Sequence, residues 1–139
     1  MILLDTNVVS EALRPEPSTK VISWLDEQVW ETLYLSAITV AELRMGAAVL
    51  PDGRKKDLLV DRLENRIFPL FEGRILSFDE PAAAVYAQIR STARKQGKAV
   101  AAADGYIAAT AKLHRMVVAT RDVSPFRAAG VKVINPWSD

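Results

Sequence analysis

The chain of 139 residues contains no cysteine and only one histidine. The lack of cysteine excludes disulfides, thiolate metal sites and cysteine nucleophiles. It favours no redox compartment, although it suits a reducing cytosol and agrees with the cytoplasmic location that we expect. No apolar run approaches the roughly 20 residues that cross a membrane. The apolar start Met1–Leu4 is short, has no basic leader and ends at Asp5. We therefore expect neither a signal peptide nor a membrane span.

Several motifs that would identify common enzyme classes are also missing. The sequence contains no glycine-rich phosphate loop, no GxSxG elbow and no dinucleotide fingerprint. The enzyme classes that depend on these motifs are therefore disfavoured. The formal net charge is only +1, with a pI of about 8. Any nucleic-acid binding must therefore come from local clusters and not from an overall basic character. The length fits a single domain over residues 1–139.

Strand and helix patterns alternate along the chain. We expect short strands at residues 1–4, 33–36, 74–77, 116–119 and 131–134. We expect helices after Thr6 and Asn7, which can cap the first one, and then at residues 18–28, 38–49, 54–67, 79–96 and 99–114. Strands separated by helices predict an α/β fold of three layers, with a central, mostly parallel sheet covered by helices on both faces.

Four acidic residues adjoin apolar segments: Asp5, Glu42, Asp104 and Asp122. Acids are rarely buried unless they are paired or bound to a cation. Asp5 and Asp122 follow predicted strands, and functional groups of open α/β sheets gather beyond the carboxyl ends of the strands. Glu42 and Asp104 lie on helices that we expect to pack on the sheet. The four carboxylates are therefore candidates for one shared pocket.

The residue types in this set favour hard-metal chemistry. Several carboxylates without histidine or cysteine select Mg²⁺ or Mn²⁺ over zinc or copper. Such ions activate water for the hydrolysis of phosphodiesters. Thr120 and Asn7 lie close in sequence to Asp122 and Asp5, where each could orient a ligand carboxylate or a water. These residues alone predict a metal-dependent phosphodiesterase or phosphohydrolase.

Each candidate also has an ordinary structural explanation. Asp5 could simply cap the following helix. Asp104 could be a first-turn acid that the helix dipole favours, and Glu42 could point away from an amphipathic helix. The basic clusters Arg54–Lys56 and Arg90 with Arg94, Lys95 and Lys98 could contact a phosphate backbone or could be solvated surfaces. We interpret His114 as a cation at the end of a helix and the three tryptophans (Trp24, Trp30 and Trp137) as packing residues.

The ordered set of these segments resembles the PIN-domain nucleases. It comprises Leu3–Asn7, the Glu42 helix, Ala103–Asp104 in its alanine-rich helix, and Ala119–Asp122. The match covers essentially the whole chain. Within that superfamily the chain looks like the VapC-type toxins of bacterial type II toxin–antitoxin modules.

The resemblance implies functions that composition does not. It implies a PIN-like fold in which Asp5, Glu42, Asp104 and Asp122 bind metal, Thr120 is the site hydroxyl and Asn7 is the polar position after the first acid. The implied activity is a Mg²⁺- or Mn²⁺-dependent endoribonuclease that acts on RNA and is blocked by a cognate antitoxin. It also implies a homodimer that meets operator DNA only through the antitoxin. Two other hypotheses remain: a regulatory subunit of an antitoxin–DNA complex with incidental hydrolysis, and a structure-specific DNA nuclease.

Overall fold

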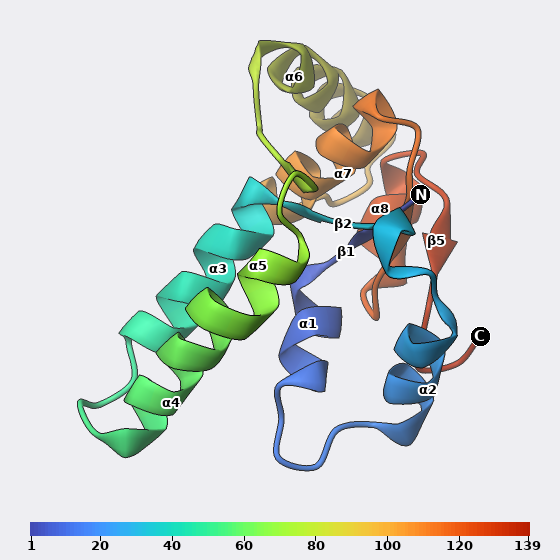
Figure 1. Ribbon diagram of the computed structural model, residues 1–139. Helices are drawn as coiled ribbons and strands as arrows, with labels where there is room; N and C mark the ends of the chain where they lie inside the picture. The colour runs from blue at the N-terminus through green and yellow to red at the C-terminus, as the bar shows by residue number, and fades with distance from the viewer.

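One five-stranded sheet runs through the centre of the molecule (Figure 1), and the computed structural model describes residues 1–139. The strand order is β3-β2-β1-β4-β5, and every neighbouring pair is parallel. The prediction of a mostly parallel sheet is therefore confirmed, and the sheet is parallel throughout. The strands are β1 (Ile2–Leu4), β2 (Leu33–Ser36), β3 (Ile75–Leu76), β4 (Val117–Ala119) and β5 (Val133–Ile134).

Helices cover both faces of the sheet and create two hydrophobic cores. Leu4 packs into one core, with residues from the first half of the chain, and Leu3 packs into the other, with residues of the later helices. This explains why the first strand is apolar without alternation, since both of its faces are buried. The helical segments are α1 (Thr6–Ala12), α2 (Thr19–Glu27), η1 (Trp30–Thr32), α3 (Ala37–Ala48), α4 (Arg54–Arg62), η2 (Leu63–Ile67), α5 (Phe68–Leu70), α6 (Glu80–Lys95), α7 (Ala102–Leu113) and α8 (Val123–Ala128).

Helices α7 and α8 differ from the sequence-based expectation. The alanine-rich helix α7 begins at Ala102 instead of Ala99, because the segment after Gly97 is extended before the N-cap Ala101. The helix α8 was not predicted. Its Pro125 is the third helical residue, where a missing N–H costs no intrahelical hydrogen bond. None of the helices is both long and apolar enough to span a membrane.

The predicted charged helix over residues 54–67 is interrupted. It begins as α4, widens into a π-helical turn in η2 and continues as the single turn α5. Leu63 and Phe68 on these turns enter the first core. The first residue of the π-helical turn and the first residue of α5 are therefore both buried in the first core.

The carboxyl ends of β2, β1 and β4 lie next to one another in the sheet. The chain leaves β1 toward β2 on one side and later returns to β4 on the other side. This reversal of strand order is the place where open α/β sheets leave a crevice for ligands. Asp5 and Thr120 directly follow β1 and β4 there.

Candidate metal centre

Asp5 connects the sheet to the first helix. Its backbone N–H donates to the carbonyl of Ala119 at 2.9 Å, which extends the pairing of β1 with β4. Its Oδ1 accepts the N–H of Thr6 at 2.8 Å, so Asp5 is the N-cap of α1. The capping role considered for Asp5 is thus confirmed, and the expectation that Thr6 or Asn7 would be the cap is wrong, because the helix begins one residue earlier. Asp5 keeps its second oxygen, Oδ2, for other contacts.

Thr120 and Asn7 surround that second oxygen. The buried hydroxyl of Thr120 donates to Asp5 Oδ2 at 2.8 Å and accepts the N–H of Asp122 at 2.9 Å. Asn7 Nδ2 donates to Thr120 Oγ1 at 3.2 Å and lies 3.3 Å from Asp5 Oδ2. Asn7 Oδ1 accepts the N–H of Arg121 at 3.3 Å. These contacts fix the loop after β4 relative to the start of α1.

Glu42 joins the group through a residue that sequence analysis missed. The Thr6 hydroxyl donates to Glu42 Oε1 at 2.6 Å and lies 3.1 Å from the hydroxyl of Thr39. Thr39 is buried at the start of α3, where its N–H donates to the N-cap hydroxyl of Ser36 at 3.0 Å. The Ser-x-x-Thr spacing at Ser36 was a visible capping signal, but nothing in the sequence linked it to Thr6.

The four acids differ in burial. Asp5 is only 5% exposed, whereas Asp104 is half-buried and both Glu42 and Asp122 are exposed. Asp104 lies in the first turn of α7, the position that the helix-dipole explanation requires. The alternative that Glu42 points away from the core is confirmed, because the buried row of α3 consists of Thr39, Val40, Leu43 and Ala47. Asp5 is therefore the one acid of the four whose charge would be buried without a cationic partner.

The carboxylates influence one another electrostatically. Burial raises the pKa of Asp5 to about 6, although the Thr120 hydroxyl and the Thr6 N–H oppose the change, and the charges of Asp104 and Glu42 add to it. Burial, followed by the charges of Asp122 and Glu42, also raises the pKa of Asp104. The four acids therefore form one negatively charged group.

The protein supplies no cation to this group. None of its three ion pairs, Arg14–Glu11, Arg44–Glu64 and Lys56–Asp52, involves any of the four acids. No three of the acidic side chains are close enough together to enclose one ion. Mg²⁺ commonly binds through only one or two carboxylates and keeps several waters, so a donor set made of carboxylate, hydroxyl and amide oxygens fits such an ion.

His114 and the three tryptophans lie at a helix end or in packing contacts. His114 is the C-cap of α7. Trp24 and Trp137 pack against the first core, and Trp30 meets the ring of Phe71 edge-on at 5.6 Å. The interpretation of His114 as a helix-end residue and of the tryptophans as packing residues agrees with these positions.

Comparison with known families places this arrangement in context. The family model for the PIN domain matches residues 2–132. The chain is similar to Toxin FitB of Neisseria gonorrhoeae, with 65% identity over 139 residues and full coverage of both chains. It is also similar to VapC ribonuclease Y4jK of Sinorhizobium fredii, with 53% identity over 99% of this chain and 98% of the relative.

The fold of the chain also matches solved structures over nearly its whole length. The crystal structure of FitAcB from Neisseria gonorrhoeae contains a chain that matches with a TM-score of 0.97 and 64% identity over 99% of both chains. The structure of FitAB bound to an IR36 DNA fragment matches with a TM-score of 0.96 and 64% identity, over 99% of this chain and 96% of that one.

Proposed function

The chain belongs to the PIN-domain family, and from this premise we propose that it is the toxin of a type II toxin–antitoxin system, a metal-dependent endoribonuclease that hydrolyses RNA phosphodiester bonds. The observation that carries the proposal is the charged group at the carboxyl edge of the sheet. Asp5 is buried there beside Thr120 and Asn7, and it is coupled to Asp104 and Glu42. The similarity to a protein named a VapC ribonuclease supports the assignment to RNA.

In this proposal Asp5, Glu42, Asp104 and Asp122 would hold Mg²⁺ or Mn²⁺, with no more than two of the carboxylates contacting one ion directly and the others acting through its waters. When bound, such an ion supplies an activated water and stabilises the departing oxygen. Thr120 and Asn7 hold the Asp5 carboxylate in one orientation through the contacts described above. Thr6 does the same for Glu42, because its hydroxyl reaches Oε1. The carboxylates of Asp5 and Glu42 are thus oriented before any ligand arrives.

The proposed partners follow from the similar complexes. One contains a protein named FitAB on a DNA fragment. By analogy we propose that a cognate antitoxin covers the acidic group of this chain and that operator DNA is met only through that antitoxin. A homodimer of the toxin is part of the same proposal. Because the substrate is RNA, the proposed place of action is the cytoplasm.

Expression in cells separates the enzyme from the regulatory alternative. The wild-type chain alone should arrest growth, and co-expression of the antitoxin should relieve the arrest. Asp104→Asn should remove the arrest, while Asp26→Asn, which changes an exposed acid on α2, should behave like wild type. Growth arrest by a stably folded Asp104→Asn protein would favour a regulatory subunit whose effect does not depend on hydrolysis.

A further inference from the structure

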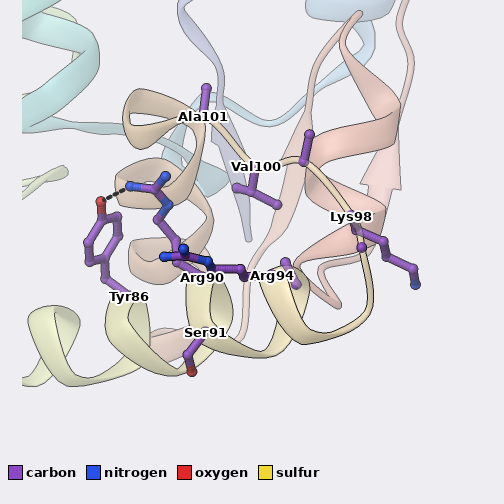
Figure 2. Close-up of a pocket in the computed structure, with 10 residues that line it drawn as sticks. Tyr86, Arg90, Ser91, Arg94, Lys98, Val100 and Ala101 are labelled. Atoms are coloured by element: carbon purple, nitrogen blue, oxygen red, sulfur yellow. Dashed lines mark hydrogen bonds between the residues drawn. The ribbon is translucent and has the colours of Figure 1, made fainter.

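A basic pocket lies beside the first turn of α7. It has a volume of about 850 Å³ and lies between the end of α6 and the segment that leads into α7. Figure 2 shows Tyr86, Arg90 and Arg94 along α6, with Val100 and Ala101 opposite them. The pocket is therefore formed by the basic cluster at the end of α6 and by the residues that lead into α7.

The charges in this pocket are of one sign and are unpaired. Arg90, Arg94 and Lys98 line it, and none of its lining residues is acidic. None of the three takes part in an ion pair. Arg90 is held in place, because its Nη1 donates to the hydroxyl of Tyr86 at 2.8 Å and its guanidinium lies 5.7 Å from the centre of that ring. An arginine oriented in this way loses less side-chain entropy when it binds an anion.

Two residues of the pocket approach the helical turn that carries Asp104. Gly105 follows Asp104 directly, and a Cβ added to it would lie 2.9 Å from the Tyr86 ring and 3.4 Å from Cδ of Arg90. The absence of a side chain at Gly105 thus lets α6 approach the turn that carries Asp104. The same approach brings the Arg90 side chain beside the backbone of that turn.

Four neighbouring carboxylates repel a polyanion, so a nucleic-acid strand that reaches them needs cationic side chains near them. The overall charge of +1 cannot supply this attraction, and a local pocket can. We propose that the pocket of Arg90, Arg94 and Lys98 binds backbone phosphates of the RNA next to the one that is cleaved. This inference rests on the proposed nuclease function and adds to it the site that holds the flanking strand.

Binding of a short single-stranded RNA, measured in EDTA over a series of salt concentrations, tests the pocket without requiring cleavage. Arg90→Gln/Arg94→Gln should weaken RNA binding roughly tenfold. The slope of the logarithm of the binding constant against the logarithm of the salt concentration should become shallower by about 1.4, or roughly 0.7 for each lost phosphate contact. The matched control is Arg54→Gln/Arg66→Gln, which removes the same charge from exposed positions on α4 and η2. It should retain the wild-type salt dependence.

Arg94→Gln/Lys98→Gln leaves the Arg90–Tyr86 contact intact and should weaken binding in the same way, which separates phosphate binding from a packing role of Arg90. Equal losses of RNA affinity in the pocket variants and in the control would overturn the proposal. Pocket variants that bind RNA like wild type but no longer bind the antitoxin would overturn it too. Failure of the wild-type protein to cleave RNA with Mg²⁺ or Mn²⁺ would instead count against the nuclease function.

Discussion

Asp5 has two roles that conflict at the scale of a single residue. As the cap of α1 it stabilises the fold, and as a buried carboxylate with no cationic partner it destabilises it. A pKa raised from 3.8 to about 6 corresponds to roughly 3 kcal/mol. That is a large fraction of a typical stability of about 5–15 kcal/mol. Such a cost at one position is characteristic of a functional site.

Asp5→Asn should therefore stabilise the metal-free protein at neutral pH. The raised pKa means that Asp5 contributes fully to stability below its ordinary pKa of 3.8 and that this contribution is lost as the pH rises through about 6. The amide avoids that loss but puts an NH₂ group where Oδ2 accepts from Thr120 and Asn7, so it gives up two hydrogen bonds worth about 1 kcal/mol each. We therefore expect a net gain of about 1 kcal/mol at pH 7. Urea unfolding in EDTA at pH 4 and pH 7 measures it. A variant less stable than wild type at pH 7 would show that the Asp5 charge is compensated.

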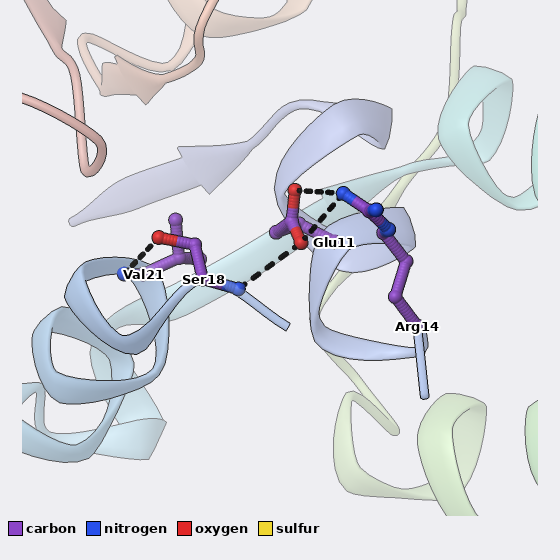
Figure 3. A network of polar contacts seen from close by, with 4 residues as sticks. All are labelled: Glu11, Arg14, Ser18 and Val21. Atoms are coloured by element: carbon purple, nitrogen blue, oxygen red, sulfur yellow. Dashed lines mark hydrogen bonds and ion pairs between the residues drawn. The ribbon is translucent and has the colours of Figure 1, made fainter. Parts of the chain in front are cut away.

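At the scale of elements, a buried glutamate fixes the turn between α1 and α2 (Figure 3). Glu11 accepts the N–H of Ser18 at 3.1 Å and pairs with Nη1 of Arg14 at 3.2 Å. Ser18 in turn caps α2 by accepting the N–H of Val21. Burial alone would raise the pKa of Glu11, but the Ser18 N–H and Arg14 together lower it. One carboxylate therefore connects the end of one helix to the start of the next.

Glu11→Gln should lower the midpoint of thermal unfolding by a few degrees at pH 7. The depressed pKa means that this carboxylate stabilises the fold above its ordinary pKa of 4.5 and that the contribution is lost as the pH falls through the lower folded value. The difference between variant and wild type should accordingly shrink in acid. Glu16→Gln, on an exposed residue of the same turn, is the control and should have no effect at either pH. An unchanged midpoint for Glu11→Gln would argue against the connecting role.

The elements also show what the sequence could and could not predict. The strands at β1 and β2 and the caps Ser18 and Asp79 were predictable, because local periodicity and capping chemistry act within a few residues. The start of α7 was not, since a run of alanines contains no boundary signal. The Thr6–Glu42 hydrogen bond joins residues on different helices, and only the packed fold brings them together.

At the scale of the whole molecule, the sheet and helices arrange charge of both signs around one edge. The acidic group lies beyond β1 and β4, and the basic pocket lies beside the first turn of α7, which carries Asp104. The sequence predicted the strand ends that place Asp5 and Asp122, and the metal-binding role of the four acids stays a prediction. It did not predict that Arg90 lies beside Gly105, because that contact depends on how closely two helices pack.

The proposed cleavage of RNA by the acidic group with a divalent metal can be measured on purified, antitoxin-free protein. The wild-type chain should cleave RNA with Mg²⁺ or Mn²⁺ and not in EDTA. Asp104→Asn should lower the rate by at least roughly 100-fold while keeping the wild-type circular dichroism spectrum, and Asp26→Asn should cleave at the wild-type rate. Metal-dependent cleavage by Asp104→Asn at the wild-type rate would contradict the account.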